Sequence, residues 1–199
     1  MSEQTTTRTS FTPTTEVKKE SQGILVGNRI PKDYFETGGV GESDIAIHAG
    51  SYHLALKSAN IEMANIMTYS SILPGIANLV ERPATIEHGA VVESIMSVCT
   101  ANRGERAAAG IVYGWLYHKK TGKKFGGLVC EHYGNYEDTA LKSLLRSSLN
   151  ELYFNGFSDD YELEDIHFLT ESVVPKKKYG TALVALCFTS YYYPILRAS

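Results

Sequence analysis

The pattern of apolar and polar positions divides most of the chain into β-strands joined by short turns. The segments that are apolar enough for strands are 61–69, 90–98, 107–118, 125–132, 163–174 and 181–192. A charged turn with a glycine, 119–124, joins two of them, as in a β-hairpin. Strands connected in this way pair antiparallel, so we expect an α+β fold with mainly antiparallel sheets in a single domain.

Two further segments carry apolar residues at helical spacing. In 51–59, apolar side chains recur on one face of the expected helix. The longer helix follows Asn135, a residue that can cap it, and ends at Gly156. Its apolar stripe consists of Leu141, Leu144, Leu145, Leu149, Leu152 and Tyr153. Each helix can therefore pack one face against a sheet.

Residues 1–22 are rich in Thr, Ser and Glu and lack apolar periodicity, so we expect a disordered tail before a folded domain of residues 23–199. An ordered extension that packs on a neighbouring subunit is the alternative. The N-terminus lacks the charged and apolar regions of a signal peptide. Three cysteines, an odd number without CxxC spacing, favour reduced thiols, a cytoplasmic location and no zinc site.

The charge and the length of the apolar runs bear on the class of partner. A net charge of −3 gives no reason to expect nucleic acid or an anionic membrane surface. The apolar runs are far shorter than the roughly 20 residues of a membrane helix. The sequence therefore favours neither nucleic-acid nor membrane binding.

The candidate chemistry centres on Ser70 and Ser71, which follow an apolar run and precede a turn at Pro74 and Gly75. A serine hydroxyl is a weak nucleophile that needs an oriented carbonyl and a polarising donor. If Ser71 Oγ attacks the Ser70 carbonyl, the amide becomes an ester, and β-elimination then cuts the chain. Residue 71 becomes dehydroalanine and, after hydrolysis, a pyruvoyl group, which is an electron sink as PLP is. A serine pair alone is more often an ordinary turn.

Seven short motifs surround and include this pair. They are 38–44 (GGVGESD), 55–56 (AL), 64–66 (ANI), 69–74 (YSSILP), 88–91 (HGAV), 110–111 (GI) and 126–131 (GGLVCE). In order and spacing they resemble the pyruvoyl-dependent arginine decarboxylases. The resemblance implies a layered αββα sandwich that cleaves itself into a β chain, 1–70, and an α chain, 71–199. It also implies a homotrimer of αβ protomers, or a higher multiple, with active sites between subunits.

The resemblance further implies the reaction and its prosthetic group. A pyruvoyl group made from Ser71 takes the place of PLP, and no metal is expected. The reaction is the decarboxylation of L-arginine to agmatine and CO₂, in polyamine or acid-resistance metabolism. The family's order of glycine loop, helix, strand and cleavage site makes 38–44 a loop that borders the substrate site, although from pattern alone it is a flexible turn.

Two residues match family positions with a role. Glu131 matches the proton donor, because a carboxylic acid kept protonated in an apolar site can protonate the substrate carbon after CO₂ leaves. Asn65 matches the asparagine used in processing, where a side-chain amide can polarise the Ser70 carbonyl. The simpler interpretations are a surface glutamate at a strand end and an asparagine that caps a turn.

Residue 53 departs from the family. The family has an aspartate there that pairs with the arginine guanidinium, because a carboxylate matches that group with two hydrogen bonds. His53 offers one acceptor when neutral and repels a cation when charged. Another acid, such as Glu42, Asp44 or Glu62, then binds the guanidinium, or the substrate is not arginine. His53 as an ordinary surface or packing residue is a further interpretation.

Two alternatives to arginine decarboxylation therefore stay open. One is a pyruvoyl-dependent decarboxylase of a different amino acid. The other is a non-catalytic interaction subunit that keeps the fold. A degenerate subunit should lack at least one processing or catalytic residue, yet the sequence retains all of Asn65, Ser70, Ser71 and Glu131.

Overall fold

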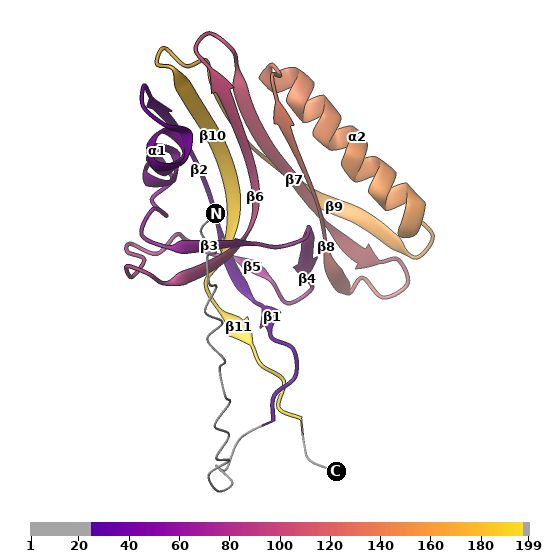
Figure 1. Ribbon diagram of the computed structural model, residues 1–199. Coiled ribbons are helices and arrows are strands. Elements are labelled where there is room, and N and C mark those ends of the chain that lie inside the picture. The colour runs from indigo at the N-terminus through magenta and orange to yellow at the C-terminus, as the bar shows by residue number, and fades with distance from the viewer. Residues whose placement is uncertain (1–24, 197–199) are drawn as a thin grey trace, which may run out of the picture.

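The computed structural model describes residues 25–196, which form two packed β-sheets between two helices (Figure 1). In sheet order, the five-stranded sheet consists of β3 (Asn65–Thr68), β6 (Val91–Asn102), β10 (Tyr179–Phe188), β2 (Asp33–Ser43) and β5 (Asn78–Leu79). The four-stranded sheet consists of β4 (Ile72–Pro74), β8 (Lys124–Gly134), β7 (Ala107–His118) and β9 (Tyr161–Val173). Most neighbouring strands are antiparallel, as predicted.

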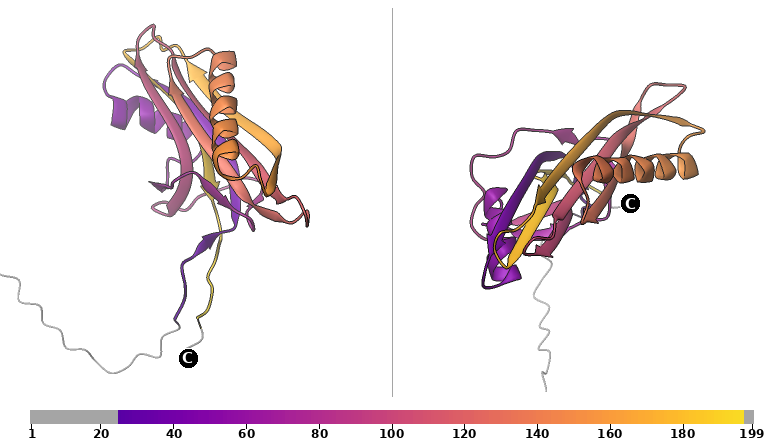
Figure 2. Two further views of the ribbon diagram at one scale, coloured as in Figure 1. Left: turned by 90° about the vertical axis from the view of Figure 1, so that its right-hand side faces the viewer. Right: turned by 90° about the horizontal axis from the view of Figure 1, so that it is seen from above.

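The helices cover the outer faces of the two sheets. A π-helical turn, η1 (Ile47–Tyr52), leads into α1 (His53–Ser58), which packs on the five-stranded sheet. The longer α2 (Asp138–Gly156) packs its leucine stripe on the four-stranded sheet. The view from above shows α1 and α2 on opposite sides of the paired sheets (Figure 2). The expected αββα sandwich is therefore confirmed.

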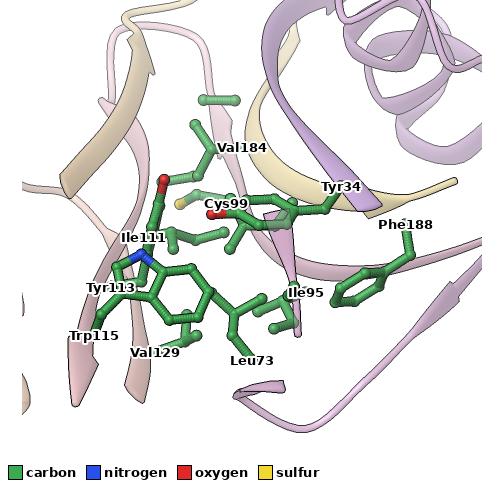
Figure 3. Packing of buried hydrophobic residues seen from close by; sticks show 14 of the residues in the cluster. Tyr34, Leu73, Ile95, Cys99, Ile111, Tyr113, Trp115, Val129, Val184 and Phe188 are labelled. Atoms are coloured by element: carbon green, nitrogen blue, oxygen red, sulfur yellow. The ribbon is translucent and has the colours of Figure 1, made fainter. Parts of the chain in front are cut away.

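The main core lies between the sheets. Because successive side chains of a strand point to opposite faces, Tyr34 faces this core while Phe35 faces α1. Tyr34 and Tyr113 meet edge to face, with ring centroids 6.1 Å apart. Figure 3 shows the packing of Tyr34, Leu73, Ile95, Cys99, Ile111, Tyr113, Trp115, Val129, Val184 and Phe188. Leu73, two residues after Ser71, belongs to this core and so anchors the serine pair to it.

The predicted loop at 38–44 is wrong, because nearly all of it lies within β2 and pairs along β10. Its glycines allow the backbone of the helical segment to approach the backbone of β2 closely. A Cβ atom on Gly41 would collide with the carbonyl oxygen of Ser51, and one on Gly39 would collide with that of Ala55. The glycines therefore let α1 lie directly on the strand, and their number reflects helix–sheet packing.

Several predicted boundaries also shift. The strand expected over 61–69 is only four residues long, because Asn60 adopts a left-handed backbone (φ 58°) and a turn follows. Glu137, without a side-chain cap, precedes α2 where Asn135 was expected, whereas Gly156 is its last residue. The hairpin at 119–124 is confirmed, with Gly122 at φ +64°.

The two ends of the described chain leave the body together. β1 (Ile30–Pro31) pairs with β11 (Tyr191–Tyr192), and Val26 bridges Ile195, which makes a narrow terminal ribbon (Figure 1). The last predicted strand is therefore split between β10 and this ribbon. The predicted tail, 1–22, lies outside the described residues. Within 25–196, no helix is both long and apolar enough to span a membrane.

Candidate active site

The serine pair lies at one edge of the sandwich, between the two sheets. β3 and β4 are the edge strands of their sheets, and Ser70 and Ser71 connect them. The Tyr69 N–H donates to the Ser94 carbonyl at 2.8 Å, which extends the pairing of β3 with β6 up to the serines. Because each side of the pair is tied to a different sheet, the short connection between them has little freedom.

The peptide between the serines is held in a tight turn. The Ile72 N–H donates to the Ser70 carbonyl oxygen at 2.9 Å, which is the i→i+2 hydrogen bond of a γ-turn centred on Ser71. This hydrogen bond polarises the carbonyl that Ser71 would attack. The donor comes from the main chain, so it requires no particular side chain at 72.

Ser71 contacts a carboxylate. Its Oγ lies 2.6 Å from Glu131 Oε1 and 2.8 Å from Glu131 Oε2. Glu131 lies within β8, opposite Ile111 of β7, and both Ser71 and Glu131 are half-buried. β4 and β8 are hydrogen-bonded neighbours, and this pairing brings two residues 60 positions apart into contact. The carboxylate therefore accepts a hydrogen bond that fixes the position of the hydroxyl.

Asn65 lies away from the scissile peptide in this structure. It begins β3, is exposed, and its Nδ2 donates to the Gly89 carbonyl at 3.0 Å. Gly89 has a positive φ of 85°, so this hydrogen bond supports a turn. The processing role of Asn65 stays a prediction.

Glu42 and Asp44 lie near the turn that precedes β10. Glu42 Oε2 accepts the N–H groups of Lys176 at 2.6 Å and Lys177 at 3.0 Å. These bonds, that of Lys177 first, hold the pKa of Glu42 below its ordinary value. Asp44 Oδ1 accepts the Lys178 N–H at 3.0 Å. One oxygen of each carboxylate is thus used to hold the turn.

His53, Glu42 and Asp44, the substrate-binding candidates, lie far from Ser71 within one chain. His53 is exposed at the start of α1, which rests on Gly41. Across β10, Gly41 is level with Thr100 of β6. Thr68, which lies two residues before Ser70, is level with Ser94 of β6. Ser94 and Thr100 are six positions apart in β6, so the serine pair and Gly41 are separated by about 20 Å along the strands, at about 3.3 Å per residue.

Comparison of the sequence with known proteins identifies the family to which the chain belongs. The family model described as pyruvoyl-dependent arginine decarboxylase matches residues 33–192. The chain belongs to the pyruvoyl-dependent arginine decarboxylase family. The resemblance stated above is therefore confirmed, and the family is one of enzymes, carboxy-lyases.

Individual relatives support the same assignment. "Pyruvoyl-dependent arginine decarboxylase AaxB" of Chlamydia trachomatis serovar L2 is 32% identical over 189 residues, covering 83% of this chain and 94% of that protein. The protein of the same name from Chlamydia caviae is 31% identical, with the same coverage. A pyruvoyl-dependent arginine decarboxylase of Methanocella arvoryzae is 34% identical over 115 residues, 56% of this chain and 68% of that protein.

The residues present fit the prosthetic group of the family. Residue 71 is a serine, the residue type whose backbone and Cβ would become the pyruvoyl group, and its position between the two sheets holds its hydroxyl against Glu131. Within residues 25–196, no three His, Cys, Asp or Glu side chains gather closely enough to bind a metal ion.

One group near the serine pair was missed by sequence reasoning. Glu93 lies in β6, almost fully buried, and accepts hydrogen bonds from the Tyr69 hydroxyl and the Arg29 guanidinium. The only sequence signal was a glutamate inside an otherwise apolar strand segment. Its partners come from distant parts of the chain, so no local pattern indicated them.

Proposed function

We propose that this protein cleaves itself between Ser70 and Ser71 and then decarboxylates L-arginine to agmatine and CO₂. The observation that carries the proposal is the contact of Ser71 Oγ with the Glu131 carboxylate, beside a carbonyl already polarised by the Ile72 N–H. Membership of the pyruvoyl-dependent family supports it, as do relatives named arginine decarboxylases.

Self-cleavage needs a nucleophile and a polarised carbonyl, and it proceeds by ester formation followed by β-elimination. Ser71 Oγ bonds to the Ser70 carbonyl carbon, its proton passes to the Ser71 nitrogen, and the C–N bond breaks, leaving an ester and a free Ser71 amine. A base then removes the Ser71 Cα proton, the Cβ–O bond breaks, and Ser70 leaves as a carboxylate. Water hydrolyses the resulting dehydroalanine, by way of its imine form, to a pyruvoyl group and ammonia. The Ile72 N–H stabilises the oxyanion formed in the first step.

In the second reaction, the decarboxylation, Glu131 donates a proton to the substrate. The pyruvoyl group supplies a ketone that draws off the electrons of the C–CO₂ bond. Glu131 is half-buried on β8, the strand between β4 and β7, and its carboxyl group contacts residue 71. When protonated, it can deliver that proton to the substrate carbon that has lost CO₂.

The substrate site is completed, in this proposal, by a second copy of the chain. Glu42 and Asp44 of one chain lie about 20 Å or more along the strands from its own serine pair, by the strand rise of about 3.3 Å per residue. The edge that carries the serine pair exposes Met67, Ile72 and Val91, and clustered exposed apolar residues are typical of interfaces. A closed homotrimer can bring the α1 end of one protomer to this edge of the next.

Cleavage and substrate are tested separately. Purified protein should separate on a denaturing gel into chains of residues 1–70 and 71–199, the larger with a blocked N-terminus. A chain that stays intact after long incubation would favour the non-catalytic subunit. The processed protein is then assayed for CO₂ release from arginine, lysine, ornithine, histidine, aspartate and glutamate.

The assay distinguishes arginine from the runner-up substrate class. Arginine should be turned over fastest. Turnover of an acidic amino acid, with none of arginine, would overturn the arginine assignment and make His53 a cationic group that binds a substrate carboxylate. The shared site is tested by the molar mass in solution, because a monomer that decarboxylates arginine would contradict it.

A further inference from the structure

A buried carboxylate lies beside the serine pair, and the cleavage chemistry does not use it. Glu93 is only 3% exposed. Its two oxygens have different partners: Oε1 accepts from the Arg29 guanidinium and Oε2 from the Tyr69 hydroxyl. A buried charge is strongly destabilising unless it is paired in this way, so its retention needs a reason.

Tyr69 is held at three points. Its N–H donates to the Ser94 carbonyl, its hydroxyl donates to Glu93, and its ring packs on Phe188 with centroids 5.5 Å apart. The next residue is Ser70, whose carbonyl carbon is the atom to be attacked. Fixing both the backbone and the ring of Tyr69 therefore limits the rotation of the peptide that carries this carbonyl.

Arg29 ties the same group to the terminal ribbon. It lies directly before β1, and its guanidinium stacks over the Tyr191 ring of β11 at 5.3 Å from the centroid. The Arg29 side chain is 45% exposed, so it joins the buried Glu93 carboxylate to the protein surface. Both ends of the described chain thus contact the network next to the serine pair.

We propose that Glu93, together with Tyr69 and Arg29, positions the Ser70–Ser71 peptide for self-cleavage. This inference rests on the proposed function. None of the three touches a reacting atom; Glu93 and Arg29 act through Tyr69, and Tyr69 acts through its peptide bond to Ser70. Attack requires the hydroxyl oxygen to lie about 3–3.5 Å from the carbonyl carbon, and a misplacement of about 1 Å can cost about 100-fold in rate.

The test compares rates of self-cleavage in freshly purified full-length chains. Tyr69→Phe removes only the hydroxyl and keeps the ring on Phe188, and Glu93→Gln removes only the charge. Each should slow cleavage by about 10- to 100-fold, the range expected from loss of alignment. Arg29→Lys keeps the cation and should cleave faster than Arg29→Met, which a purely steric role would not explain.

The matched control is Tyr113→Phe. Tyr113 is buried, and its hydroxyl donates to Glu36 at 2.5 Å across the sandwich, so the variant loses the same kind of hydrogen bond. It should lower Tm about as much as Tyr69→Phe and leave the cleavage rate unchanged. Equal slowing in both variants would mean general destabilisation and would overturn the positioning role.

Hydroxylamine, which cleaves esters, identifies the step that is affected. If the network aligns the first attack, the slow variants accumulate no ester, and added hydroxylamine leaves their cleavage slow. Acceleration to the wild-type rate would place the defect after ester formation and contradict the inference. Wild-type cleavage in folded Tyr69→Phe and Glu93→Gln chains also overturns it, and leaves the proposed function intact. A wild-type chain that never cleaves contradicts the proposed function itself.

Discussion

The two ends of the sandwich both carry carboxylates that lie within a family motif, yet those carboxylates have different partners. At the β3 end, Glu131 contacts the hydroxyl of Ser71, beside the peptide to be cut. At the far end, Glu42 and Asp44 accept main-chain N–H groups of the turn before β10. The first contact is suited to moving a proton, and the second to holding a turn. Position within a motif therefore distinguishes these carboxylates less well than the atom each one contacts.

The largest effect is expected at the serine end. Ser71→Ala removes the attacking oxygen, so the chain should stay intact at 199 residues, as judged by mass spectrometry. The matched control is Ser94→Ala, because the buried Ser94 hydroxyl has no hydrogen-bond partner among residues 25–196, while its carbonyl still accepts the Tyr69 N–H. The control should cleave normally. Cleavage of Ser71→Ala at the same site would require a different nucleophile.

Glu131→Gln should separate the two reactions. The amide oxygen can still accept the Ser71 hydroxyl, so self-cleavage should continue. Decarboxylation should fall by about 10²–10⁴-fold, the usual loss when general acid catalysis is removed. The measurement is kcat of the fully processed variant. If kcat stays near the wild-type value, a different group donates the proton, and Glu131 resembles the carboxylates of the far end.

The far end is tested by Glu42→Gln combined with Asp44→Asn. The hydrogen bonds of these carboxylates use Glu42 Oε2 and Asp44 Oδ1, which leaves an oxygen of each for a guanidinium brought by a neighbouring protomer. The KM for arginine should rise roughly 10-fold, as expected for loss of a charge-assisted hydrogen bond, with self-cleavage unchanged. An unchanged KM would assign guanidinium binding to other residues, with Glu62 as the next candidate.

The sequence predicted the serine end better than the far end, for physical reasons. Ser70 and Ser71 are adjacent and lie between a strand and a turn, so local pattern and family resemblance agree there. The glycines of 38–44 suggested a loop, because sequence alone does not show that a helix backbone rests on Gly39 and Gly41. The pairing of Glu93 with Arg29 joins residues 64 positions apart and carries no periodic signal.

The smallest effect concerns stability in acid. The N–H groups of Lys177 and Lys176 hold the pKa of Glu42 below its ordinary value. A carboxylate with a lowered folded-state pKa stabilises the fold above its unfolded pKa, about 4.3, and this contribution is lost as the pH falls through the folded-state value. Because Glu42 is partly exposed, the contribution should be below about 1 kcal/mol.

Glu42→Gln should therefore have a slightly lower Tm than the wild type at pH 7, and the two values should converge as the pH approaches 3. The comparison uses Ser71→Ala as the common background, so that both chains are intact and chain cutting does not affect Tm. A Tm difference that persists unchanged from pH 7 to pH 3 would mean that the Glu42 charge does not stabilise the turn. The two ends of the sandwich would then differ less than the hydrogen bonds indicate.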